Sequence, residues 1–170
     1  GAQVEAGAYP TSYIPTTTAA VARGLETAEM SDVTWANQSE GTIVSESYHR
    51  DEVTNFSQIC SLNDDTVNSY HSLAFHGGTG QRLRVGTADG GAVQWNNTNV
   101  GDGDDNTIIR TAYAYKLNDM AAVINGGTVA TDSAATMPTF TQFVIGDRAS
   151  SNIVPFNGTI ARIEYWPTRK

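Results

Sequence analysis

The sequence predicts an all-β domain, a sandwich or barrel of short strands, on three observations. From Thr27 onward, short segments of alternating apolar and polar residues recur at a spacing of roughly ten residues, with Gly, Asn or Asp between them. The chain contains 16 glycines and many Thr, Ser and Asn residues, which are typical of turns. No stretch after Thr27 supports a helix of about three turns, because no apolar stripe with helical period is present.

The segments that we expect to be strands follow one another along the chain, and tight turns join several of them. They are 41–48, 56–62, 68–75, 82–87, 92–96, 107–117, 120–124, 128–131, 139–145 and 158–166. "RLRVGTADGGAVQWNN" reads as a hairpin with "TADGG" at its tip, and Asn118-Asp119 and Gly126-Gly127 mark two further turns.

The composition fits one packed domain. A chain of 170 residues with 39% hydrophobic and 16% charged residues is long and apolar enough for one core. We expect residues 1–24 to be an extended linker from a preceding module, because "YPTSYIPTTTAAVARG" has two prolines, a threonine run and no periodicity. The domain then spans residues 25–170. A helix over "AAVARGLETAEM" is the second interpretation, since that segment lacks a clear apolar stripe.

The formal net charge of -8 disfavours nucleic acid and anionic membranes, because both attract clusters of Lys and Arg. No apolar run approaches the ~20 residues that cross a bilayer, so membrane insertion is not expected. Cys60 is the only cysteine, and in the strand-like run "NFSQICSL" we expect a buried, inert thiol.

Three segments together resemble a known family: "WANQSEGTIVSESYH", "YAYKLNDMAAVINGGTVATDSAATMPTFTQFVIGDR" and "FNGTIARIEYWPTRK". In order and spacing, they resemble the concanavalin A-like or laminin G-like jelly-roll domains of phage virion and tail-fibre proteins. The resemblance implies a two-sheet antiparallel jelly-roll sandwich. It also implies a location on a virion or outside the cell, with contacts to other virion subunits.

That superfamily includes glucanases, polysaccharide lyases and lectins, so the fold does not choose among them. A glucanase of this fold carries Glu-x-Asp-x-x-Glu, and no segment here has it, because Glu46 and Glu164 each stand alone. The lyase pattern Gln-Ile-His is replaced by Gln-Ile-Cys at residues 58–60. Tyr70 with His71, or His76, could still supply a base. An enzyme is therefore the minority interpretation.

A carbohydrate site is predicted around the hairpin. If the loop closes symmetrically about Asp89, Arg82, Arg84 and Trp95 share one face. The indole would stack on a sugar ring, and guanidinium and amide groups would bind its hydroxyls. In the alternative, Trp95 packs in the core or forms a cation–π contact with Arg82. The predicted ligand-binding residues are Trp95, Arg82, Arg84, Asn96, Arg110, Tyr70 and His71.

The loop "NVGDGDDNT" predicts a calcium site formed by Asp102, Asp104 and Asp105, because calcium prefers several hard oxygen ligands. The alternative is a solvated turn, in which Asp and Gly are the ordinary residues.

The function expected from the sequence is that of a non-catalytic, lectin-like module of a phage structural or tail-fibre protein that recognises a host or environmental polysaccharide. The alternatives are a purely structural virion decoration or assembly domain, and a polysaccharide-degrading enzyme or its accessory module.

Overall fold

The computed structural model describes residues 28–49, 56–76, 81–97, 100–103, 107–148, 154–156 and 158–170. All regular structure in these ranges is β-strand, and none of them holds a helix that could span a bilayer. The strands are β1 Ala28–Met30, β2 Glu40–His49, β3 Phe56–Asn63, β4 Tyr70–His76, β5 Gln81–Asp89, β6 Ala92–Asn97, β7 Asp102–Gly103, β8 Ile108–Lys116, β9 Met120–Ile124, β10 Ala130–Asp132, β11 Gln142–Ile145 and β12 Gly158–Trp166.

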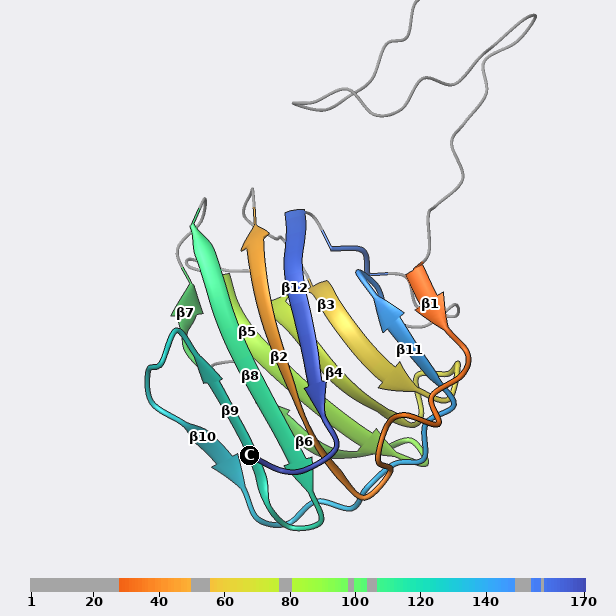
Figure 1. Ribbon diagram of the computed structural model, residues 1–170. Coiled ribbons are helices and arrows are strands. Elements are labelled where there is room, and N and C mark those ends of the chain that lie inside the picture. The colour runs from red at the N-terminus through yellow and green to blue at the C-terminus, as the bar shows by residue number, and fades with distance from the viewer. Residues whose placement is uncertain are drawn as a thin grey trace, which may run out of the picture.

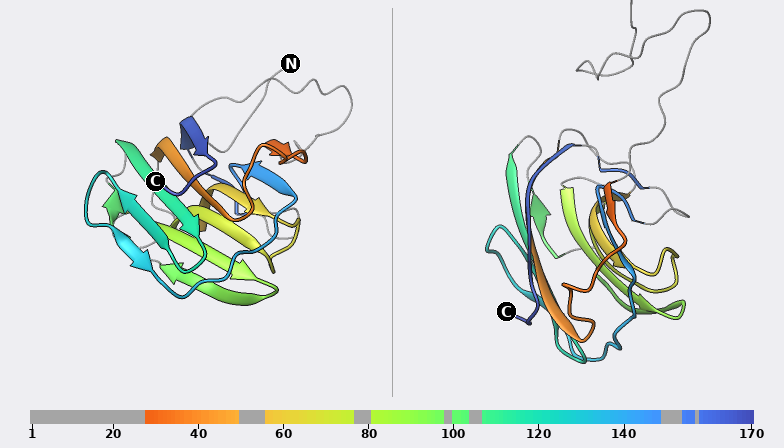
Figure 2. Two further views of the ribbon diagram at one scale, coloured as in Figure 1. Left: turned by 60° about the horizontal axis from the view of Figure 1, so that its bottom comes forward. Right: turned by 45° about the vertical axis from the view of Figure 1, so that its right-hand side comes forward.

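The strands form two antiparallel sheets that face each other (Figure 1). The seven-stranded sheet has the order β1-β11-β3-β4-β5-β6, with β7 paired to β5, and the five-stranded sheet has the order β10-β9-β8-β2-β12. Neighbours such as β11 and β3, or β2 and β12, lie far apart in the sequence. The views in Figure 2 show the two sheets as curved layers of a sandwich.

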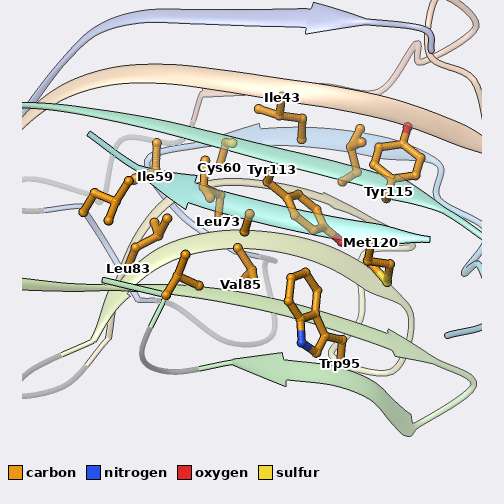
Figure 3. Packing of buried hydrophobic residues seen from close by; sticks show 14 of the residues in the cluster. Ile43, Ile59, Cys60, Leu73, Leu83, Val85, Trp95, Tyr113, Tyr115 and Met120 are labelled. Carbon is orange, nitrogen blue, oxygen red and sulfur yellow. The ribbon is translucent and has the colours of Figure 1, made fainter. Parts of the chain in front are cut away.

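The core lies between the two sheets, where alternate residues of each strand meet (Figure 3). Leu73 and Phe75 of β4 and Leu83 of β5 point inward from the seven-stranded sheet, opposite Ile43 and Tyr113 of the five-stranded sheet. All five are no more than 2% exposed. Side chains of a strand alternate between its two faces, so the residues between these apolar positions point away from the core.

The all-β, two-sheet fold predicted from the sequence is confirmed, and the expected bounds of β9 and β12 match those observed. β1 and β7, which have only 3 and 2 residues, were not predicted. The helix alternative is wrong at Ala28–Met30, which pair with β11 as a strand. The predicted boundary at residues 24 and 25 lies outside the described residues.

A β-bulge in the β5–β6 hairpin overturns the predicted face of Trp95. The hairpin turns at Gly90 and Gly91, which have φ of 57° and 85°, so Ala88 pairs with Val93. Without a bulge, Trp95 would then lie opposite Gly86, on the outward face. Instead Trp95 pairs with Thr87, because one extra residue interrupts the register between the two pairs. Its indole is 7% exposed and lies in the core, 6.2 Å from the ring of Tyr113.

The expectation for Cys60 is confirmed. Its side chain is 1% exposed, and burial raises the pKa of the thiol to about 12. At neutral pH the thiol therefore stays protonated and unreactive.

Candidate functional site

The outer face of the seven-stranded sheet, turned away from the core, carries buried polar side chains. On β4, Tyr70 and Ser72 alternate with the inward-pointing His71 and Leu73, and both are nearly inaccessible at 4% and 1% exposure. Asn63, which lies on the neighbouring strand β3, pairs with Tyr70 and is fully buried. An outer sheet face with groups of this kind is unusual, because polar side chains there are ordinarily solvated.

Arg84 of β5 lies on this face and is only 6% exposed. Its Nε donates a hydrogen bond of 3.0 Å to Asn96 Oδ1 on β6, and its Cζ lies 4.4 Å from the centre of the Phe56 ring. Burial lowers the pKa of the Arg84 guanidinium, Tyr70 acts in the opposite direction, and the positive charge of Arg148 lowers it further. A second cation is therefore close enough to destabilise the charge on Arg84.

Arg148 reaches the same place from the loop that follows β11. Its Cζ lies 4.0 Å from the centre of the Tyr70 ring, a cation–π contact. Within the described part of the chain, the buried Arg148 Nε has no hydrogen-bond partner, and neither has the buried Ser72 Oγ on β4. Buried polar atoms are nearly always hydrogen-bonded in folded proteins, so two unsatisfied atoms at one place suggest a ligand.

No carboxylate neutralises the two guanidinium groups within the described part of the chain. The ion pairs found there use Arg82, Arg110, Lys116, Arg162 and Arg169, and neither Arg84 nor Arg148 is among them. We call this place the arginine site and define it by six residues: Tyr70, Ser72, Arg84, Gly86, Asn96 and Arg148. It is a local concentration of positive charge on a protein whose formal net charge is -8.

Gly86 forms the floor of the arginine site. A Cβ atom at this position would lie 3.1 Å from Ser72 Oγ, 3.3 Å from Tyr70 Cε2 and 3.4 Å from Arg84 Nη2. The three side chains therefore converge above the glycine, and any larger residue would displace them. Asn96 is exposed and Arg148 is half-buried, so these two residues provide the accessible rim.

The structure brings together three of the predicted ligand-binding residues, Tyr70, Arg84 and Asn96. Arg82 lies on the same face but near its end, where it forms an ion pair of 3.3 Å with Asp102. Arg110 is elsewhere: it points outward from the five-stranded sheet and pairs with Glu46 at 3.0 Å. The predicted grouping of Arg110 with Arg84 is therefore wrong, because β8 and β5 belong to different sheets.

His71 is also wrongly placed by the sequence analysis. It points into the core, where its Nδ1 lies 2.8 Å from the Tyr113 hydroxyl and its ring stacks on Tyr115 with centroids 4.2 Å apart. Burial lowers the pKa of His71 to about 3. A neutral imidazole enclosed between two sheets cannot reach a bound polysaccharide, so the suggestion that His71 acts as a base is also wrong.

The predicted calcium loop is described only in part, because Asp104 and Asp105 lie outside the described residues. Asp102 belongs to β7, and its carboxylate is paired with Arg82. Within the described ranges, no three His, Cys, Asp or Glu side chains gather as a metal site would require. Calcium binding by Asp102, Asp104 and Asp105 stays a prediction.

Arg148 and Phe56 were not among the predicted site residues. Arg148 follows a strand in "FVIGDR", and nothing in that motif indicates that the loop folds back over Tyr70. Phe56 could have been found from its position, since it begins an expected strand and shares a face with the alternate residues of its neighbours. In the structure Phe56 pairs with His76, and His76 pairs with Arg82, so Phe56 lies on the outer face.

Comparison with known proteins supports the fold. No protein-family model matches the chain, and no curated protein matches it in sequence. Among solved structures, the CBM40 of Ruminococcus gnavus IT-sialidase, bound to α2,6 sialyllactose, superposes with a TM-score of 0.67 at 15% identity, over 85% of this chain and 87% of that one. The chain is therefore an all-β jelly-roll domain with lectin-like neighbours.

Two further structures are similar. The NanB sialidase of Streptococcus pneumoniae has a TM-score of 0.68 at 11% identity, over 85% of this chain and 25% of that chain. Domains LG4-5 of the mouse laminin α1 chain have a TM-score of 0.58 at 10% identity, over 84% and 40%. At these identities the likeness concerns the fold, and it agrees with the laminin G-like resemblance of the sequence.

Proposed function

We propose that this domain is a non-catalytic carbohydrate-binding module that takes an acidic glycan at the arginine site. The observation that carries the proposal is the pair formed by the buried Arg84 and the half-buried Arg148, neither of which has a carboxylate partner in the described residues. A carboxylate or sulfate group on a sugar would neutralise both and accept hydrogen bonds from them. Asn96 and Ser72 would bind neighbouring hydroxyl groups.

The similar structures support a sugar ligand rather than a simple anion. One of them holds sialyllactose, a trisaccharide that carries a carboxylate, and another is a laminin LG domain pair. The kind of parent protein and its location rest on the sequence resemblance alone. On that resemblance, we propose that the module belongs to a phage virion or tail-fibre protein, lies on a virion or outside the cell, and recognises a host or environmental polysaccharide.

The test is binding of the purified domain to matched acidic and neutral glycans by calorimetry. We expect saturable binding of sialyllactose or an oligogalacturonate, and affinity at least about tenfold lower for lactose, because the neutral sugar leaves both guanidinium groups unpaired. A parallel series with calcium and with a chelator tests the Asp102 loop. Absence of binding to all acidic and neutral glycans by a folded protein would overturn the proposal.

A structural assembly role is the second candidate function, because the outer face of the five-stranded sheet holds an apolar groove. The groove has a volume of about 560 Å³, and Ala112, Ala114 and Ala121 contribute to its lining beside Trp166 and the half-exposed Val129. Exposed apolar patches often mark protein contacts. If this role is correct, light scattering will show a concentration-dependent oligomer that Ala114→Arg disrupts, whereas a monomer at all concentrations would argue against self-assembly through this face.

A further inference from the structure

The loop that carries Arg148 begins with a fixed turn. Gly146 has a φ of 74°, a backbone conformation that suits glycine. Its N–H donates a hydrogen bond of 2.8 Å to Ile59 O on β3, and its carbonyl accepts one of 2.8 Å from Phe156 N. The start of the loop is thereby attached to the seven-stranded sheet on one side and to the segment at residues 154–156 on the other.

Asp147 is a buried acid, 6% exposed, next to Arg148 in the sequence. Its Oδ1 accepts two hydrogen bonds of 2.7 Å, one from Arg148 N and one from Val154 N. Among the described residues it forms no ion pair with an arginine. One oxygen of the carboxylate, Oδ1, is therefore bound by two backbone N–H groups, and such groups stabilise a negative charge well.

The carbonyl side of Arg148 is fixed as well. Asn63 Nδ2 donates a hydrogen bond of 2.5 Å to Arg148 O. Asn63 is fully buried, and its Oδ1 accepts bonds from Gln142 Nε2 at 2.7 Å and from Asp65 N at 2.8 Å. The backbone of Arg148 is thus held at both its N–H and its C=O, and its side chain extends over the Tyr70 ring.

We propose that Asp147 is a positioning residue of the arginine site. It holds Arg148 over Tyr70 through the Arg148 and Val154 amides, and both guanidinium groups stay without a carboxylate partner among the described residues. The proposal rests on the proposed function for its ligand. A carboxylate this close to the site would compete with an anionic sugar if its oxygens turned toward Arg148. The two amide bonds hold Oδ1, and among the described residues Asp147 forms no ion pair with Arg148, so the nearest acid in sequence supports the cationic site.

The test compares Asp147→Asn with Asp147→Ala. Asn keeps the Oδ1 acceptor, so we expect its affinity for sialyllactose to stay within about threefold of the wild type. Ala leaves both amides without their acceptor, and its affinity should fall by about tenfold or more in a protein that is still folded by circular dichroism. Asp132→Ala is the matched control, since Asp132 also accepts a backbone bond, 2.8 Å from Ala134 N, at the edge of the other sheet.

A second measurement needs no ligand. In proton NMR spectra, the Tyr70 ring should shift the Arg148 side-chain signals upfield in the wild type and in Asp147→Asn, and Asp147→Ala should lose the shift. The variant Tyr70→Leu should also lose the upfield shift, which would identify the Tyr70 ring as the source of the shift. Retention of the upfield shift in Asp147→Ala, or equal loss of affinity in both Asp147 variants, would overturn the proposal. If the wild type binds no glycan, the proposed function fails, and the NMR result still decides the role of Asp147.

Discussion

Arg84→Met should abolish most acidic-glycan binding and yet leave the free energy of unfolding unchanged or higher. We expect affinity to fall roughly 10- to 100-fold, as for the loss of hydrogen bonds to a charged group. Stability should not fall, because Arg84 is buried beside Arg148 with no acid paired to it among the described residues, and removing an uncompensated buried charge is often neutral or favourable. Methionine keeps an apolar contact with Phe56, and the exposed Asn96 can bond to water instead. Calorimetry and urea unfolding measure the two quantities.

Arg110→Met provides the matched control on the other sheet. Arg110 is 65% exposed in its side chain and paired with Glu46, so its removal should change neither affinity nor stability by more than about 1 kcal/mol. A large loss of stability in Arg84→Met would identify Arg84 as a structural residue of the sheet face. The proposed acidic ligand would then lose its main support.

The domain should lose stability as the pH falls from 6.5 toward 3, because His71 is held neutral in the core. Its pKa is about 3 in the folded state, compared with an ordinary value of 6.5, so between these pH values the unfolded chain binds a proton that the native state does not. The stability contributed by neutral His71 is complete above pH 6.5 and decreases by roughly 1 kcal/mol per pH unit below it. Urea unfolding between pH 7.5 and 5 measures the slope before most carboxylates titrate.

His71→Phe isolates the contribution of this residue. Phenylalanine can stack on Tyr115, and the Tyr113 and Thr87 hydroxyls, 2.6 Å apart, still bond to each other. The variant should therefore show a shallower dependence of stability on pH than the wild type over the same range. An equal slope in both proteins would mean that other groups cause the acid sensitivity.

Local sequence signals were sufficient for the all-β class, because strand alternation and turn residues act at short range, whereas the two-sheet jelly roll was implied by the family resemblance. The bounds of β9 and β12 were predicted correctly, since β9 ends at the Asn125-Gly126 turn and β12 ends directly before Pro167. β1 and β7 were missed for a physical reason: strands of 3 and 2 residues have no periodicity of their own and exist only because β11 and β5 lie beside them.

The site was predictable only where it depends on alternation along one strand. Tyr70 and Arg84 follow from their neighbours in β4 and β5. The face of Trp95 required knowledge of a bulge, and the position of Arg148 required the path of a loop that is fixed by Asp147 and by Asn63, 85 residues earlier in the chain. Such long-range contacts leave no local pattern.

The bulge in β6 also has a consequence for comparing this domain with others. Because one inserted residue exchanges the inward and outward sets of a strand, two chains can align through this hairpin without a gap and still present different side chains to a ligand. Transfer of ligand-contacting positions by alignment is unsafe beyond Val93. In evolution, a single-codon insertion or deletion there could replace the recognition surface of β6 in one step, while β3, β4 and β5 keep theirs.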